Sequence, residues 1–256
     1  MAFSVYLFFQ NLFSEKRTLT QRLSLKMVVD NALAGAKGDY GIAIKNLKNN
    51  ESYYLNEHRV FDTGSLYKLW IMAVAYKKIE EGSLSKDKVL SGDEVTLTAG
   101  EALNQMITIS HNDSALLLTK EVKLSTVALF LKENKFNESL VGTDNSEPKS
   151  SAADILSFYE KLYRRELGST ENTEKMINLL KNQKLNDGLP KYLPQELPIA
   201  HKTGDIHLFK HDAGIIITEK GDYIIVIMSE SEFPLGAQER IALISKAVND
   251  YFSKTK

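Results

Sequence analysis

Residues 61–70 read FDTGSLYKLW and place Ser65 and Lys68 three positions apart, at the start of a long apolar run. The spacing alone does not identify a site, because Ser-x-x-Lys occurs five times in the chain, beginning at Ser65, Ser83, Ser85, Ser146 and Ser253. Only the first of these begins a strongly apolar helical pattern, LYKLWIMAVAYKKI. The others lie in polar stretches or at the C-terminus, so Ser65 is the candidate that we carry forward.

Three physical effects would act together on this pair. A spacing of three residues places Lys68 on the same helix face as Ser65. Free N–H groups at a helix N-terminus stabilise negative charge, and a lysine held against apolar side chains loses hydration and becomes a better base. We expect Asp62 or Thr63 to cap this helix. The alternative interpretation is an ordinary N-terminal serine followed by a solvated lysine.

The composition excludes several classes of protein. The chain has 256 residues, 43% of them apolar and 25% charged, which is ordinary for a globular protein with one large domain or two lobes. A formal net charge of -1 gives no general attraction to nucleic acid. Without cysteine there is no disulfide framework, thiolate nucleophile or cysteine-based zinc site. His207 and His211 lie four positions apart, but in a strand context, so we expect no metal.

The N-terminal residues contain a short apolar run, FSVYLFFQNLF at 3–13, followed by charged residues. The run is too short to span a bilayer, and it lacks the basic leader and small-residue cleavage site of a signal peptide. It is either the remnant of a trimmed export segment or a strand or helix packed on the body. We treat residues 1–21 as an extension of unknown role.

Strand patterns lie at both ends of the chain, and helical patterns fill the middle. YGIAIKNL with ESYYLN predicts one hairpin, and AGIIIT with YIIVIMS predicts another. Apolar periodicity predicts helices at 22–34, from Ser65 to before Gly82, and at 100–108, 112–121, 124–134, 151–166, 171–182 and 236–254. This order predicts an α+β fold, in which an antiparallel sheet from both chain ends is flanked by the terminal helices and carries an inserted all-helical lobe.

We assign residues 22–256 to a single domain, with an α/β lobe at 22–61 and 197–256 and a helical lobe at 62–196. A site would lie between the lobes, where pockets commonly form. Two further motifs lie at these predicted junctions.

The first junction motif is MITISHNDSALLL at 106–118. Ser110 and Asn112 lie two apart at the turn between two helices, where a hydroxyl and a carboxamide can point the same way. Ser110 could relay a proton, and Asn112 could bind a substrate amide. The alternative is that Asn112 or Asp113 only caps the following helix.

The second junction motif is AHKTGDI at 200–206. Lys202 supplies a positive charge and Thr203 a hydroxyl, which suit a substrate carboxylate. Gly204 permits close approach of another backbone or a ligand. The alternative is a β-turn before an edge strand.

Taken in order, the three motifs resemble those of the penicillin-recognising serine enzymes, most closely the class A β-lactamases. The segments around them, such as VTLTAGEALNQMITISHNDSALLL and LPIAHKTGDIHLFKHDAGIIIT, are similar too, and the resemblance covers residues 22–254. It implies a β-lactamase/transpeptidase-like fold. It also implies a nucleophile at Ser65, a base or base partner at Lys68, a proton relay at Ser110, a substrate-amide binder at Asn112, carboxylate binders at Lys202 and Thr203, and an oxyanion hole of the Ser65 and Asp205 N–H groups.

The chain departs from this family at three positions. Glu147 begins a Glu-Pro pair that matches the family's deacylating glutamate, but the Leu-Asn that should follow is missing and the loop is shortened. Glu147 is thus either the deacylating base or, as the pattern favours, a solvated loop residue. Asp205 stands where a small or hydroxyl residue is usual and would repel a substrate carboxylate unless it points away. His111 replaces an aspartate, which weakens the resemblance little.

The resemblance leads to three hypotheses of function. The first is a class A-like serine β-lactamase that hydrolyses a β-lactam amide. The second is a penicillin-binding D-alanyl-D-alanine peptidase-like or esterase-like enzyme that acylates and deacylates poorly. The third is a non-catalytic sensor or binding domain of the same fold. The expected partner is a small-molecule β-lactam or peptidoglycan-like peptide, with no cofactor, metal or nucleic acid, and the expected protein is an extracytoplasmic monomer.

Overall fold

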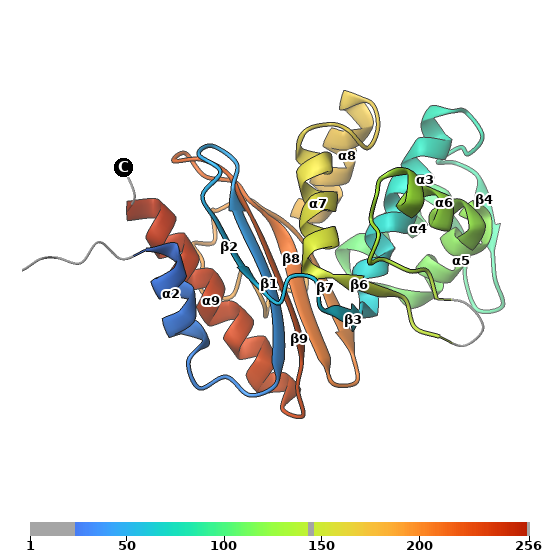
Figure 1. Ribbon diagram of the computed structural model, residues 1–256. Coiled ribbons are helices and arrows are strands. Elements are labelled where there is room, and N and C mark those ends of the chain that lie inside the picture. Colours follow the sequence, from blue (N-terminus) through green and yellow to red (C-terminus); the bar gives the residue numbers. More distant parts are fainter. Residues whose placement is uncertain (1–23, 143–145, 255–256) are drawn as a thin grey trace, which may run out of the picture.

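The computed structural model describes residues 24–142 and 146–254, arranged as layers on the two faces of a sheet (Figure 1). Two terminal helices, α2 (Leu25–Leu33) and α9 (Pro234–Lys254), cover one face. Helix α7 (Ala152–Tyr163) packs on the other face with α8 (Thr170–Lys181) beside it, and α3 to α6, within residues 68–133, lie farther from the sheet. The predicted extension at 1–21 lies outside the described residues.

The central sheet of the described residues is antiparallel, with five strands in the order β2-β1-β9-β8-β7. Its strands are β1 (Asp39–Asn46), β2 (Ser52–Leu55), β7 (Ile199–Ile206), β8 (Phe209–Ile216) and β9 (Tyr223–Glu230). Strands from the two ends of the chain pair directly, because β1 lies beside β9. The predicted fold class is therefore confirmed, and β7 is left at an open edge.

Strand β9 shows why the strands of this sheet have continuously apolar sequences. Ile225 and Ile227 pack with the terminal helices, whereas Val226 and Met228 pack with α7 and the helices beyond it. A strand covered on both faces has no solvent side, so polar residues do not alternate with apolar ones.

The helical part surrounds α3 (Lys68–Glu80), which is buried on all sides from Lys68 to Tyr76. A helix that is apolar all round belongs in the centre of a core. Around it lie α4 (Ala99–Thr108), α5 (Asn112–Val122), α6 (Leu124–Glu133) and α8 (Thr170–Lys181). Sheet residues such as Ala43 share one core with these helices, and the division into two lobes at 61/62 and 196/197 stays a prediction.

Two short strand pairs were not predicted. These are β3 (Val60–Asp62) with β6 (Lys149–Ser151), and β4 (Val89–Ser91) with β5 (Thr96–Thr98). Three residues carry too little alternation to be recognised in a sequence. The β3–β6 pair matters for function, because it ties the segment after Glu147 to the strand that leads into Ser65.

The predicted cap of the helix after Ser65 is wrong. The chain enters α3 through a 3-10 helix, η1 (Gly64–Tyr67), which makes no side-chain cap. The Thr63 hydroxyl donates instead to the Gly64 carbonyl oxygen at 3.0 Å. The Asp62 carboxylate forms an ion pair with Lys149 across the β3–β6 pair.

The alternative role considered for Asn112 or Asp113, as the cap of α5, is also wrong. The capping residue is His111, whose Nδ1 accepts a hydrogen bond from the Ser114 N–H at 3.3 Å. Asn112 is the first residue of α5. Its side chain is therefore free to take part in the cluster described below.

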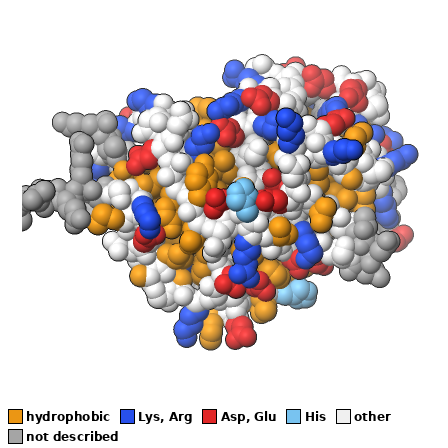
Figure 2. All heavy atoms as spheres, in the orientation of Figure 1, with side chains coloured by type: hydrophobic (Ala, Val, Ile, Leu, Met, Phe, Trp, Pro, Cys, Tyr) orange, Lys and Arg blue, Asp and Glu red, His pale blue; other side chains and the backbone are white. Residues whose placement is uncertain are grey.

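The visible surface is mixed in charge. Figure 2 shows basic and acidic side chains interspersed over one face of the molecule. None of the helices in residues 24–142 and 146–254 combines the length and the apolar character needed to cross a bilayer.

Candidate active site

Lys68, at the start of α3, is fully buried, with 0% of its surface exposed. Its ammonium donates to the Ser110 carbonyl oxygen at 2.6 Å, to the Asn112 Oδ1 at 2.7 Å and to the Ser110 Oγ at 3.3 Å. Burial lowers the pKa of Lys68 to about 8. Within the described residues no carboxylate forms an ion pair with it, so this amine loses its proton far more easily than an exposed lysine.

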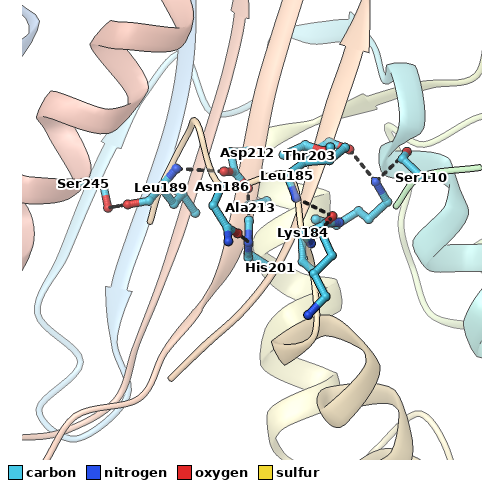
Figure 3. Close-up of polar contacts among 12 residues, drawn as sticks. Ser110, Lys184, Leu185, Asn186, Leu189, His201, Thr203, Asp212, Ala213 and Ser245 are labelled. Atoms are coloured by element: carbon cyan, nitrogen blue, oxygen red, sulfur yellow. Dashed lines mark hydrogen bonds and ion pairs between the residues drawn. The ribbon is translucent and has the colours of Figure 1, made fainter. Parts of the chain in front are cut away.

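Ser110 lies in the turn between α4 and α5 and has a φ of 59°. Side-chain-bearing residues rarely occupy this left-handed region, and strained backbone is concentrated at functional sites. The turn directs the Ser110 hydroxyl toward the edge strand, where it accepts from the Lys202 Nζ at 2.9 Å (Figure 3).

Lys202 reaches this hydroxyl from the opposite side, from strand β7. It is also 0% exposed, and its second bond goes to the Thr203 carbonyl oxygen at 3.0 Å. Burial, and to a smaller extent the positive charge of Lys68, lower the pKa of Lys202 to about 7, although the negative charge of Asp212 acts in the opposite direction. One hydroxyl thus lies between two buried amines, an arrangement that can pass a proton between them.

Ser65 lies half-buried in η1, one turn before Lys68. Residues three apart in a 3-10 helix lie on the same side. The structure shows no hydrogen bond between Ser65 and Lys68, and within the described residues the Ser65 hydroxyl makes none at all. Catalytic contacts are often long in a free enzyme and tighten only with substrate, so Ser65 remains the proposed nucleophile.

Two glycines let β7 lie directly against η1. Gly64 has a φ of 47°, and a Cβ there would lie 2.7 Å from the Asp205 nitrogen. A Cβ on Gly204 would lie 2.4 Å from the Thr63 carbonyl oxygen. Larger residues would push the two segments apart, so these glycines keep the main chains of Ser65 and Asp205 adjacent, as the predicted oxyanion hole requires.

The Asp205 carboxylate has a partner that the sequence did not reveal. Asp205 forms an ion pair with Lys210, which lies opposite it on β8. The Asp205 side chain is 63% exposed and that of Lys210 only 16%. Lys210 therefore balances the negative charge of Asp205 two residues after Thr203.

Glu147 is exposed and makes no hydrogen bond to Lys68. It lies beside a largely apolar pocket of about 240 Å³, whose wall also includes Asn112 and Tyr67. Burial raises the pKa of Tyr67, and the nearby Glu147 charge raises it further. The Thr63 N–H donates to the Pro148 carbonyl oxygen at 2.8 Å, so this segment is tied to the one that carries Ser65.

The described residues contain no group of three or more histidine, cysteine, aspartate or glutamate side chains arranged to hold a metal ion. His211 is buried between the Asp62 carbonyl oxygen, at 2.7 Å from Nε2, and the Ser229 N–H, at 3.0 Å from Nδ1. Burial lowers the pKa of His211 to about 4. His207 is exposed, so these two histidines do not converge on one site.

The sequence profile of the beta-lactamase enzyme family matches residues 24–252. The chain belongs to the beta-lactamase enzyme family. No curated protein matches the chain. Among solved structures, PBP-A is 20% identical with a TM-score of 0.84, over 93% of this chain and 97% of PBP-A.

Two β-lactamases of known structure share the fold as well. The β-lactamase from Sphaerobacter thermophilus is 21% identical with a TM-score of 0.82, over 91% of this chain and 98% of that one. A class A β-lactamase from Bacteroides cellulosilyticus is 20% identical with a TM-score of 0.80, over 94% of this chain and 100% of that one. The predicted family and β-lactamase/transpeptidase-like fold are therefore confirmed.

Proposed function

We propose that this member of the beta-lactamase enzyme family is a class A-like serine β-lactamase that forms an acyl-enzyme on Ser65. The observation that carries the proposal is the pair of buried amines, Lys68 and Lys202, that share the Ser110 hydroxyl beside η1. Two buried lysines that form no ion pair with a carboxylate of the described residues are costly, which indicates a function rather than a contribution to stability.

Acylation would proceed by general-base catalysis. Neutral Lys68 accepts the Ser65 hydroxyl proton while Ser65 Oγ attacks the carbonyl carbon of the β-lactam. The N–H groups of Ser65 and Asp205 stabilise the oxyanion. The carbon–nitrogen bond then breaks, and the leaving nitrogen takes a proton through Ser110. The result is an ester on Ser65 and an opened ring.

The substrate would help to prepare this site. A carboxylate bound at Lys202 and Thr203 favours the protonated form of Lys202. Because the two ammonium groups repel each other, a charged Lys202 in turn favours neutral Lys68. Asn112, held by Lys68 at 2.7 Å, would bind the amide of the substrate side chain. A substrate with a carboxylate thus brings the base into its working state.

Hydrolysis of the ester by water would complete turnover, and it separates the two leading hypotheses. The exposed Glu147, which has no bond to Lys68, favours slow deacylation. The second candidate is therefore a penicillin-binding or D-alanyl-D-alanine peptidase-like enzyme whose acyl-enzyme persists. Among similar structures is an acyl-enzyme complex of a PBP-A mutant with penicillin G. Because the chain belongs to this family, we also propose that the protein acts outside the cytoplasm.

One experiment tests the proposal. The protein is mixed with a chromogenic cephalosporin, and colour change and intact mass are recorded together. Turnover supports the β-lactamase, and a stable adduct that is absent in Ser65→Ala supports the penicillin-binding enzyme. Neither adduct nor turnover would refute both and leave a non-catalytic domain of the same fold.

A further inference from the structure

The chain between α8 and β7 contains a short segment, residues 183–189, that we call the connector. Asn186 Oδ1 of this segment lies 3.2 Å from Nε2 of His201 on β7. The Leu189 N–H donates to the Asp212 carboxylate on β8 at 2.8 Å (Figure 3). The connector is therefore held against two neighbouring strands of the sheet, one of which is the edge strand β7.

The first residue of the connector, Gln183, reaches the end of α4. Its side chain is 4% exposed, and its Nε2 donates to the Ile107 carbonyl oxygen at 2.7 Å. Its Oε1 accepts from the N–H groups of Lys184 at 2.9 Å and Leu185 at 3.1 Å. The Lys184 N–H also donates to the Thr108 carbonyl oxygen at 2.8 Å. Because a carbonyl oxygen needs a donor and an N–H needs an acceptor, these partners fix the orientation of the Gln183 amide.

The Ser110 turn creates the need for this contact. The Ile107 carbonyl lies in the last turn of α4, where a helix leaves its carbonyl oxygens without partners. In a continuing helix the His111 N–H would donate to Ile107, but here it donates to the Gln105 carbonyl oxygen at 3.2 Å. The chain leaves the helix because Ser110 has a φ of 59°. Gln183 thus replaces the donor that the Ser110 turn takes away from Ile107.

The same contact favours the strained conformation of Ser110. A strained backbone persists only where the surrounding structure holds it. Without the Gln183 amide, the Ile107 carbonyl could regain a partner if α4 continued to His111, and Ser110 would then leave the left-handed region. Its hydroxyl would move away from the Lys202 Nζ, which now lies 2.9 Å from it.

Other contacts hold the Ser110 turn from its opposite side. The Lys68 ammonium donates to the Ser110 carbonyl oxygen at 2.6 Å. The Ser114 hydroxyl donates to the Gln105 Oε1 at 3.2 Å and lies 2.9 Å from Nδ1 of His111. These contacts join the turn to α3 and join α5 to α4, whereas Gln183 joins the end of α4 to a segment that is fastened to the sheet.

We propose that Gln183 is a positioning residue, which holds the end of α4 against the connector and thereby keeps the Ser110 hydroxyl within reach of Lys202. The effect on acylation rests on the proposed function, in which Ser110 passes a proton to the leaving nitrogen. The effect on the geometry of the turn does not.

The first test is amide hydrogen exchange, measured by NMR, in Gln183→Met, which keeps the length of the side chain and removes its amide. The N–H groups of Ile109 and His111 both donate to the Gln105 carbonyl oxygen at 3.2 Å and so report on the turn. Relative to the amides of β9, which report on global unfolding, their exchange is expected to become about tenfold faster. Gln183→Glu, which removes the donor and keeps both acceptor contacts, is expected to act in the same direction and serves if Gln183→Met does not fold.

Asn172→Leu is the matched control, because Asn172 is another buried side-chain amide that reaches the last turn of a neighbouring helix. It is 6% exposed, and its Nδ2 donates to the Tyr76 carbonyl oxygen of α3 at 3.4 Å. This variant is expected to leave the exchange of Ile109 and His111 unchanged relative to β9. The same result in the Gln183 variants would overturn the positioning role.

A double-mutant cycle decides whether Gln183 acts through the Ser110 hydroxyl. Gln183→Met is expected to slow acylation by a chromogenic cephalosporin about tenfold, as part of the contribution of a proton-transferring group. Ser110→Gly removes the hydroxyl and tolerates a positive φ, so adding Gln183→Met to it is expected to cause no further slowing. Equal slowing in both backgrounds would contradict a role through this hydroxyl. A wild-type protein that is not acylated would refute the proposed function, and hydrogen exchange would still decide the role of Gln183.

Discussion

Lys68 is the residue on which the proposed acylation depends most. Its amine is buried, its pKa is lowered to about 8, and its three oxygen partners come from Ser110 and Asn112. In Lys68→Ala, Ser65 loses its proton acceptor, and acylation by a chromogenic cephalosporin is expected to fall by about 10²–10⁴-fold. Lys77→Ala, at an exposed position of α3, is the control. A Lys68→Ala protein that acylates at the wild-type rate would contradict the assigned role.

For Glu147, unlike Lys68, substitution is expected to change the rate very little. Because its side chain is exposed and makes no bond to Lys68, Glu147→Gln is expected to leave the rate of deacylation within about twofold of wild type, as for a surface substitution. The measurement is the decay of the acyl-enzyme by intact mass, with Glu219→Gln as a control on a distant turn. Strong accumulation of acyl-enzyme in Glu147→Gln alone would show that this glutamate is the deacylating base after all.

The motif residues could be proposed from the sequence, but their partners could not. Ser110 and Lys202 stood out because short local patterns carry them. Lys210 and Asp212 did not, because they act across the ladder to β7, and the register that pairs them with Asp205 and Thr203 is set by the whole sheet. Local patterns therefore indicated the chemistry, and tertiary pairing supplied the charges that tune it.

Long elements were predictable for a physical reason, and short ones were not. Helix α9 shows its apolar period over 21 residues, whereas β3 has only three residues and no period at all. The predicted start of α3 was also wrong, because a 3-10 turn and an α-helix begin with the same apolar pattern. Function depends on these short elements, since η1 carries Ser65 and β3–β6 holds the segment next to it.

At the element scale, Asp154 holds the base of the segment that carries Glu147. Its carboxylate accepts from the Ser139 hydroxyl and the Glu138 N–H, both at 2.8 Å, and the Ser139 and Ser150 hydroxyls lie 2.8 Å apart. Asp154→Ala would take the acceptor from the Glu138 N–H and leave the Ser139 hydroxyl with Ser150 alone, so the free energy of unfolding is expected to fall by about 1–3 kcal/mol. Urea denaturation measures it.

Asp154→Asn is the variant to compare with Asp154→Ala, because its amide oxygen still accepts a hydrogen bond while the charge is lost. It is expected to be destabilised less than Asp154→Ala. If Asp154→Ala were as stable as the wild type, the contacts between Asp154 and residues 138–139 would not hold this segment.

At the scale of the whole molecule, the fold brings together groups that a stable core would avoid. The edge strand comes from the C-terminal part of the chain, whereas α3 and the Ser110 turn come from the middle. Their junction encloses two amines, and the apolar core around them lowers the pKa of Lys68 to about 8 and that of Lys202 to about 7. The same burial that makes a base costs stability whenever these amines are charged.

The cost of burying two charged amines predicts how the free energy of unfolding depends on pH. Lysines in the unfolded chain have a pKa near 10.4, so between about pH 7 and 9 the unfolded chain binds more protons than the folded one, and the free energy of unfolding rises with pH. The gain in the free energy of unfolding is complete only above the pKa of the lysines in the unfolded chain. It is lost as the pH falls through the pKa values of Lys68 and Lys202 in the folded protein. Buried tyrosines, whose pKa is raised, do not oppose this rise below about pH 10.

Lys202→Met tests the source of that dependence. Without the buried amine, the free energy of unfolding at pH 7 is expected to rise by about 1–3 kcal/mol, and its increase toward pH 9 is expected to flatten. Lys132→Met, at an exposed position of α6, should leave the slope unchanged. Urea denaturation at several pH values measures both. A wild-type protein whose stability did not rise from pH 7 to 9 would mean that Lys68 and Lys202 stay charged inside the fold, and the proposed base would then have no neutral form to act with.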